Sequence, residues 1–216
     1  TGVPIKFLLS LAGNISYVMD LFPKSRPFFA PFTWFLSQLN AICQDNKHLW
    51  QVWMKKYIQV PPILISMVLE GWSNIYLQKA HALDLVKLGF DAKVRFAVDW
   101  CPTGGGSHNF LTKQYFHILW PEGHELTLNC STKGEYFMLF LASTVWCKPG
   151  DDAEVDEDNQ GCIAVVEKFR SKRSFGDIAI AFGRFCQRNN TTIYPRFEGT
   201  NDITADPLSR TNDKDW

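Results

Sequence analysis

The spacing of apolar residues changes near residue 91, and this change limits the possible folds more than any other feature. Before it, apolar side chains recur every three or four positions, which predicts helices over residues 5–22, 31–43, 47–58 and 63–78. After it, residues 94–101 alternate between apolar and polar side chains, which is typical of a half-buried strand. The sequence therefore predicts a small all-α region over residues 1–90 and an α/β region over residues 91–216.

The α/β region alternates strand-like and helix-like segments. Strands are predicted over residues 94–101, 108–112 and 115–120, and the PTGGGS stretch after the first is predicted to be a turn. Further along, the sequence predicts helices over 132–147, 159–170 and 175–189, strands over 151–159 and 191–197, and a short helix over 202–210. Such an order predicts a mixed sheet covered by helices.

The charges balance overall but are unevenly distributed along the chain, which has 22 Lys and Arg residues and 22 Asp and Glu residues. Residues 1–90 carry 8 basic against 4 acidic residues, whereas residues 91–216 carry 14 against 18. A basic region beside an acidic one suits a protein that holds a polyanion and binds metal. Ordinary surface variation explains the same imbalance equally well.

The six cysteines and the apolar runs indicate the environment of the protein. No two cysteines form a C-x-x-C pair, so neither a zinc ribbon nor a thioredoxin-like site is predicted. We therefore expect reduced thiols in an intracellular protein of the cytoplasm or nucleus. The longest apolar run, residues 63–69, is shorter than the roughly 20 residues that span a bilayer, so no membrane partner is expected.

Four acidic residues have sequence contexts that suit a cation site: Asp99, Glu135, Asp158 and Asp206. Carboxylates that converge from several elements are the ligands that hard divalent cations require. Each acid also has a local explanation, as a turn residue, a first-turn helix acid, a helix cap or a surface acid. The remaining acids around Asp158 are predicted to be solvated on a strand edge: Asp151, Asp152, Glu154, Asp156 and Glu157.

The motifs around the four acids occur in a recognisable order. Asp99 lies in VDWCPTGGG, Glu135 in KGEYFMLFLA, and Asp158 in EDNQGCIAVVEKF, while Asp206 lies in the most specific of the motifs, GTNDITADPLSR. Together these segments resemble the ribonuclease H domain of retroelement reverse transcriptases over residues 93–210. The resemblance implies a ribonuclease H-like fold, in which a mixed five-stranded sheet is flanked by helices.

The preceding region continues the resemblance. Residues 8–29, with the sequence LLSLAGNISYVMDLFPKSRPFF, are similar to the thumb and connection regions of gypsy-type, pararetroviral or DIRS-like elements. The chain contains no Y-x-D-D motif, so no polymerase active site is expected. The resemblance implies a fragment of a longer reverse transcriptase polyprotein, with the rest of that polyprotein as a partner, and leaves the oligomeric state open.

The resemblance also implies a reaction and a role for each acid. The family cleaves the RNA strand of RNA/DNA hybrids with two Mg²⁺ ions, for which Mn²⁺ can substitute. Asp99 would bridge the two ions, Glu135 and Asp158 would each complete the shell of one ion, and Asp206 would hold the ion that activates water. Candidate contacts to the hybrid are Asn159, Gln160, Arg170, Lys172, Arg173 and Arg196, with helix capping and a solvated loop as alternatives.

The chain departs from the family pattern at two places. The family often has Ala and Ser after the first Asp, whereas this chain has Trp100 and Cys101. Many relatives carry a His before the last Asp, and the stretch before Asp206 has none. These departures leave open a catalytically inactive scaffold retained by a host. A transposase or integrase of the same broad fold, with a three-acid site, is a third alternative that the ADPLSR ending disfavours.

Overall fold

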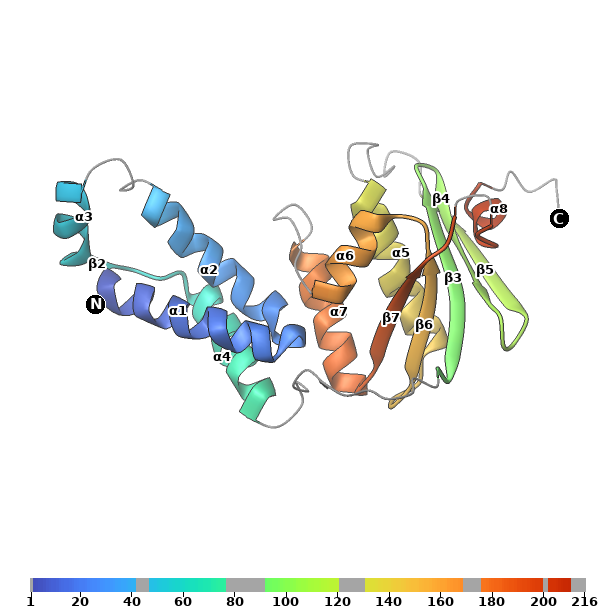
Figure 1. The fold of residues 1–216 in the computed structure, drawn as a ribbon, viewed down its shortest axis with the longest axis horizontal. Helices are drawn as coiled ribbons and strands as arrows, with labels where there is room; N and C mark the ends of the chain where they lie inside the picture. Colours follow the sequence, from blue (N-terminus) through green and yellow to red (C-terminus); the bar gives the residue numbers. More distant parts are fainter. Residues whose placement is uncertain are drawn as a thin grey trace. The chain divides into compact units, whose positions relative to one another are not determined.

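The computed structural model describes residues 2–41, 47–76, 92–120, 131–168, 176–199 and 202–210 (Figure 1). The chain divides into two compact units. The first consists of Thr1–Val86 with Lys172–Gly176, and the second of Lys87–Ser171 with Asp177–Trp216. The boundary predicted between residues 90 and 91 lies outside the described residues. No helix in the described ranges is long and apolar enough to cross a membrane.

The first unit is mainly helical. Its elements are β1 (Val3–Pro4), α1 (Ile5–Leu21), the 3-10 helix η1 (Pro23–Ser25), α2 (Arg26–Ala41), α3 (Lys47–Met54), β2 (Tyr57–Ile58) and α4 (Pro62–Tyr76). The two short strands pair antiparallel, so this region is not purely α-helical as predicted. Apolar side chains of α1, α2 and α4 form its core, among them Leu8, Ile15, Phe29, Leu36 and Val68.

Helix α2 begins earlier than its apolar pattern indicated, at Arg26 rather than near residue 31. Pro27 lies in the first turn, where a missing backbone N–H costs nothing. Close packing against α4 stabilises this turn, because Gly71 lets the ring of Phe29 approach to 2.8 Å from the position that a Cβ atom would occupy. With this packing, α2 includes both Pro27 and Pro31.

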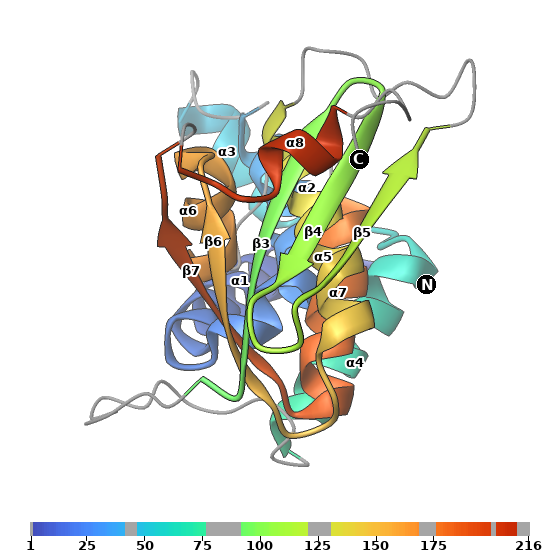
Figure 2. The same cartoon turned by 90° about the vertical axis from the view of Figure 1, so that its right-hand side faces the viewer.

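The second unit has one five-stranded sheet (Figure 2). Its elements are β3 (Val94–Cys101), β4 (Gly104–Asn109), β5 (Gln114–Leu119), α5 (Ser131–Trp146), β6 (Asp152–Glu157), α6 (Gln160–Lys168), α7 (Gly176–Asn189), β7 (Thr192–Phe197) and α8 (Asp206–Ser209). The strand order is β5-β4-β3-β6-β7. Strands β3, β4 and β5 pair antiparallel, and β6 joins β3 and β7 in parallel. The predicted fold class, a mixed five-stranded ribonuclease H-like sheet flanked by helices, is confirmed.

Helices cover the two faces of this sheet unequally. Figure 2 shows α8 in front of the sheet and α5, α6 and α7 behind it. On the rear face, aromatic rings join α5 to α7, with the Tyr136 and Phe182 ring centroids 5.4 Å apart. On the front face, Ala97 packs against Ile203 and Ala205 just before α8. Among the described residues, α8 and the segment just before it therefore cover the front face, whereas three helices cover the rear face.

Strand β4 occupies the stretch that was predicted to be a turn. The glycines of PTGGGS form the strand Gly104–Asn109, and the strand predicted over residues 108–112 was wrong, because residues 110–113 make the turn to β5. A Cβ atom on Gly106 would overlap Leu208 of α8, and one on Gly105 would overlap Met138 of α5. The glycines are therefore needed for packing on both faces rather than for a turn.

Candidate metal centre

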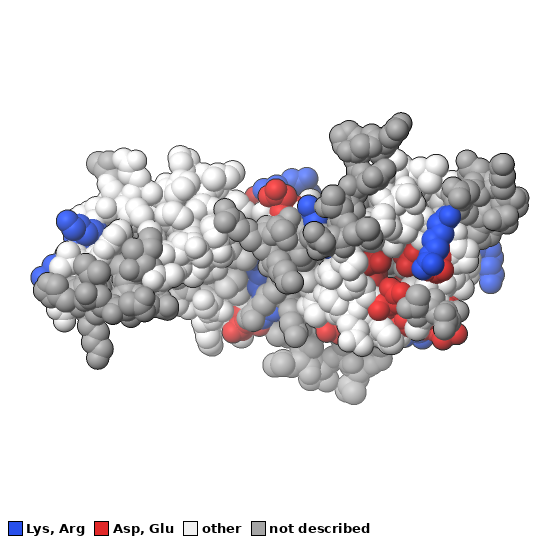
Figure 3. Space-filling model, turned by 90° about the horizontal axis from the view of Figure 1, so that it is seen from above, with Lys and Arg blue, Asp and Glu red and all other residues white. Residues whose placement is uncertain are grey.

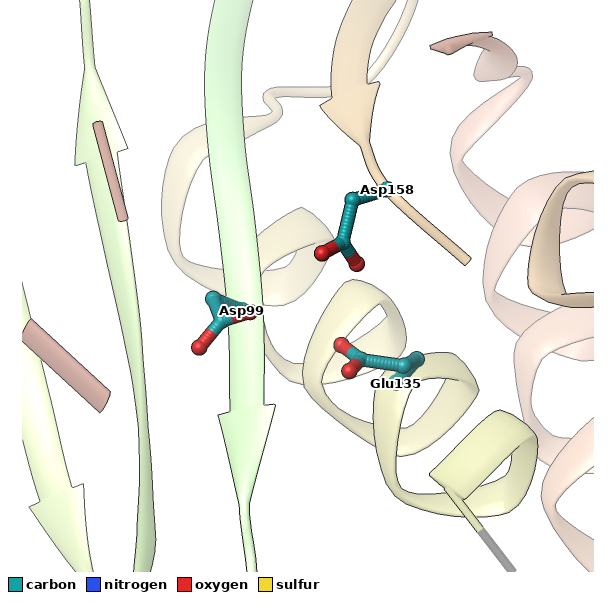
Figure 4. A group of neighbouring side chains, drawn as sticks. All are labelled: Asp99, Glu135 and Asp158. Atoms are coloured by element: carbon teal, nitrogen blue, oxygen red, sulfur yellow. The ribbon is translucent and has the colours of Figure 1, made fainter. Parts of the chain in front are cut away.

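Three of the four predicted acids converge at one edge of the sheet (Figure 4). Asp99 lies on β3, Glu135 in the first turns of α5, and Asp158 directly after β6. Carboxylate oxygens from the three side chains lie within 4.8 Å of one another. Figure 4 shows the Glu135 and Asp158 carboxylates reaching from separate elements into the same space beside β3.

Strand register explains why Asp99 and Asp158 meet. Strands β3 and β6 are parallel neighbours, and Ala97 pairs with Asp156. Continuing this register by two residues places Asp99 beside Asp158, on the same side of the sheet end. Parallel strands present their carboxyl ends at one edge, where α/β proteins commonly bind ligands.

Contacts between α5 and β3 place Glu135 beside these two acids. A Cβ atom on Gly134 would overlap the Trp100 indole, so the glycine lets the first turns of α5 lie directly on β3. The backbone N–H of Trp100 donates a hydrogen bond to the Glu135 carboxylate. Because side chains alternate along a strand, the Trp100 indole lies on the α5 face and the Asp99 side chain on the other. The indole therefore packs against the first turns of α5 and does not cover Asp99.

Burial makes the acid group electrostatically costly. Asp99 is only 4 % exposed, and burial raises the pKa of its carboxyl from 3.8 to about 6. A hydrogen bond from Ser209 opposes this rise in pKa, whereas the charges of Asp206 and Asp158 add to it. Burial, followed by repulsion from Glu157, raises the pKa of Glu135 to about 11. The metal-free group therefore holds protons that a bound cation would displace.

Glu157 is a buried member of this neighbourhood that the sequence analysis missed. Its side chain is fully buried, and burial raises its pKa well above the ordinary value. Oε1 accepts a hydrogen bond from the Asn159 N–H at 3.0 Å, while Oε2 has no hydrogen-bond partner in the structure as described. The prediction of a solvated position was wrong. The period-two pattern of Ala153, Val155 and Glu157 on β6 was the available signal, because it places Glu157 on the buried face.

Asp156, the residue before Glu157, was also wrongly predicted to be solvated. It is 3 % exposed, and its carboxylate accepts hydrogen bonds from Arg95 at 3.0 Å and from Arg196 at 2.9 Å. The two arginines reach it from the strands on either side, β3 and β7. Asp156 is therefore a structural acid with its own internal cations.

Asp206, the fourth predicted acid, lies next to the group of three but not within it. It begins α8 and forms an ion pair with Arg210 across one helical turn. Its charge contributes to the raised pKa of Asp99, so the two carboxylates lie close enough to interact. The Ser209 hydroxyl oxygen also lies 3.0 Å from the Asp206 backbone carbonyl, so its single proton is shared between this carbonyl and the Asp99 carboxylate.

The residues predicted to contact nucleic acid have mixed positions. Arg170, Lys172 and Arg173 lie outside the described residues. Arg196 makes ion pairs with Glu154, Asp156 and Glu198 at 3.4, 2.9 and 3.1 Å, so its guanidinium already has protein partners.

Asn159 and Gln160 stand at the start of α6. The Asn159 side chain caps this helix, because its Oδ1 accepts the Cys162 N–H at 3.0 Å, whereas Gln160 is exposed. Figure 3 shows acidic side chains gathered on the second unit, with a basic side chain beside them. Basic side chains are also visible elsewhere in this view, so the acidic grouping belongs to this part of the second unit.

The donor set of the three acids fits a hard divalent cation. It consists of carboxylate oxygens from three separate elements, which is the chemistry such ions require. Glu135 Oε2 is buried and has no hydrogen-bond partner in the described part of the chain, so this oxygen is available to a cation. A buried acidic group of this kind can hold a metal ion.

Comparison with known proteins adds no further information about the site. No protein-family model matches the chain, and no curated protein matches it. The basis for a functional proposal is therefore the fold, the acid group and the sequence motifs that carry it.

Proposed function

We propose that the second unit is a metal-dependent endonuclease of the ribonuclease H type, which cleaves the RNA strand of RNA/DNA hybrids. The observation that supports this most strongly is the convergence of Asp99, Glu135 and Asp158 at the edge of a ribonuclease H-like sheet. In this proposal the chain is part of a reverse transcriptase polyprotein, and the first unit is its connection region.

The metal in this proposal is Mg²⁺, as two ions, with Mn²⁺ able to substitute. Asp99, Glu135 and Asp158 would hold the ions together with Asp206, whose carboxylate interacts with that of Asp99. Ions bound there supply positive charge that activates water and stabilises the departing oxygen in phosphodiester hydrolysis. Mg²⁺ binds six oxygens, so water and a substrate phosphate would complete each shell.

The protein orients these carboxylates through its own hydrogen bonds. The Trp100 N–H holds Glu135, and the Ser209 side chain holds Asp99. Because these donors belong to β3 and α8, they would favour one orientation of the Glu135 and Asp99 carboxylates before an ion binds. Such preorganisation reduces the ordering cost of binding a cation and of holding a phosphate in position.

A cleavage assay tests the proposal. Purified chain with Mg²⁺ or Mn²⁺ is expected to cut the labelled RNA strand of an RNA/DNA hybrid and to leave the DNA strand intact. Asp158→Asn should reduce cleavage to background, because it removes a charged ligand and keeps the side-chain shape. Asp177→Asn, at an exposed position in the first turn of α7, is the matched control and should cleave normally. An intact hybrid after long incubation of the unmodified chain with Mn²⁺ would refute the proposal.

One observation favours a second candidate, a scaffold that binds metal or nucleic acid without cleaving. Asp206 is paired with Arg210 and lies outside the group of three acids. If this ion pair persists when metal binds, the second ion lacks a ligand and cleavage is lost. Calorimetry that shows Mn²⁺ binding in a chain that does not cut the hybrid would identify this case.

A further inference from the structure

The first turn of α5 lies between the two strand ends that carry the other acids. On one side, Gly134 packs against the ring of Trp100, the residue after Asp99. On the other side, the turn contacts Asn159, the residue after Asp158. The neighbours of both aspartates therefore touch the helical turn that presents Glu135.

Asn159 links α5 to α6 through its side chain. The Thr132 hydroxyl donates to Asn159 Oδ1 at 3.3 Å, and Asn159 Nδ2 donates to the Ser131 hydroxyl at 3.4 Å. The same Oδ1 accepts the Cys162 N–H at the start of α6. One amide therefore caps one helix and joins it to the first turn of another.

Gly161 makes this link sterically possible. A Cβ atom at this position would lie 2.8 Å from the Thr132 hydroxyl oxygen and 3.0 Å from Asn159 Oδ1. Both distances are shorter than van der Waals contact, so a larger residue would displace the Thr132 and Asn159 side chains from each other. The glycine and the hydrogen bonds are independent observations of the same close approach.

We propose that Thr132 and Asn159 are positioning residues that set the distance between the Glu135 and Asp158 carboxylates. The inference rests on the proposed function, because the group that they position is the proposed metal site. Residues that orient ligands without touching the ion commonly change metal affinity about 10- to 100-fold when they are replaced. Here the orienting contact acts between two backbone segments, each of which carries a ligand.

Three substitutions separate the link from helix capping. Thr132→Val keeps the shape of the side chain and removes the hydroxyl donor. Asn159→Ser keeps a good capping residue but is too short to reach Thr132. Thr132→Ser keeps the hydroxyl and is the conservative rescue.

The measurement is calorimetric titration of the full chain with Mn²⁺ alone, together with thermal unfolding of each variant in EDTA. Thr132→Val and Asn159→Ser are expected to weaken Mn²⁺ binding by about 10-fold, while Thr132→Ser stays within about 2-fold of the unmodified chain. Unfolding midpoints should change little, because the caps remain. A purely structural role would lower the midpoint and leave the Mn²⁺ affinity of the folded chain unchanged.

Alanine substitutions at two separate glycines, Gly161 and Gly13, provide a second, independent test. Gly161→Ala should weaken Mn²⁺ binding because the added methyl group pushes Thr132 away from Asn159. Gly13→Ala in α1 is the matched control, since nothing lies within 4 Å of its Cβ position. Its Mn²⁺ affinity should equal that of the unmodified chain.

The outcomes distinguish this inference from the proposed function. Unchanged Mn²⁺ affinity in Thr132→Val and Asn159→Ser overturns the positioning role, even if the chain cleaves hybrids. Weaker binding in these variants supports the positioning role, even if the unmodified chain binds Mn²⁺ and cleaves nothing. Absence of Mn²⁺ binding by the unmodified chain overturns both.

Discussion

Two adjacent residues at the end of β6 are both buried acids, yet the charged groups around them have opposite signs. Asp156 is 3 % exposed and has Arg95 and Arg196 within hydrogen-bonding distance. Glu157 is fully buried, and the neighbouring charges that raise its pKa are those of Asp158 and Asp99. The Asp156 carboxylate is therefore neutralised by cations of the protein, whereas the Glu157 carboxyl has further acids as its neighbours.

This difference distinguishes Asp156, a structural acid, from the acids around Glu157, whose charge the protein does not neutralise. Burying a carboxylate is costly unless a cation or several hydrogen bonds compensate for it. At Asp156, the two arginines provide the compensation. At Glu157, the neighbouring groups are acids, and Oε2 has no hydrogen-bond partner among the described residues. The missing compensation is what a cation from solution would provide.

The largest expected effect comes from removing the internal cations. Replacing Arg95 and Arg196 together by Gln leaves Asp156 buried without a counter-charge. We expect the free energy of unfolding to fall by about 3 kcal/mol, the lower end for a broken buried pair, because both arginines are partly exposed. Urea denaturation measures this loss, and adding Asp156→Asn to the double variant should recover part of it. No loss of stability in the double variant would show that the arginines do not compensate for Asp156.

The next effect is the pH dependence of stability without metal. Asp99 has a pKa of about 6 when folded and 3.8 as its ordinary value, so the folded state binds the proton more tightly. The stabilisation is therefore fully present below pH 3.8 and is lost as the pH rises through 6, by about 2 to 3 kcal/mol. Thermal unfolding in EDTA across this range, compared with Asp99→Asn, isolates the contribution.

Metal should reverse this loss. Bound Mg²⁺ or Mn²⁺ stabilises the ionised carboxylates, so the unfolding midpoint at pH 7 should rise with metal concentration. Asp99→Asn should show a smaller rise, and a variant that loses the arginine pair at Asp156 should show a normal one. An equal rise in Asp99→Asn and the unmodified chain would place the metal elsewhere.

The smallest expected effect is the change in stability when Glu157 is replaced, compared with the change when its neighbour Asp156 is replaced. Glu157→Gln keeps an acceptor for the Asn159 N–H and cannot ionise beside Asp158. We expect this variant to be more stable than the unmodified chain by about 1 kcal/mol at pH 8 in EDTA. Asp156→Asn should be less stable, because it removes the buried negative charge that pairs with Arg95 and Arg196. Changes of the same sign in both variants would contradict the comparison.

Much of the second unit could be predicted from its sequence, because the relevant patterns are local. Alternating apolar residues identify β3, and helical spacing identifies α5 and α7. Asp99 lies near the end of β3, and Asp158 follows β6. That these two acids meet Glu135 was expected from the resemblance of their motifs to ribonuclease H, because the segments taken singly do not show which strands are neighbours.

The remaining features depend on contacts between distant parts of the chain. The glycines of β4 resemble a turn locally, and only their packing against Leu208 and Met138 shows why a strand needs them. The Trp100 indole lies on the face of β3 that packs against α5. The close contact between Gly134 and the indole shows which face that is, and the contact is not visible in the sequence. Composition suggested a solvated acidic strand at β6, although strand alternation already pointed to a buried Glu157.

The glycine strand also has a consequence for the order in which this protein is made. The Cys101 thiol, at the end of β3, bonds to the Ser209 carbonyl of α8 across 108 positions of the chain. Strands β3 and β4 are therefore translated well before the helix that packs on β4, and closing so long a loop is slow. Until α8 is translated, Asp99 lacks its Ser209 hydrogen bond and one face of β4 lacks its cover. The acid group therefore reaches its final form only after α8 has been made and has packed on β4.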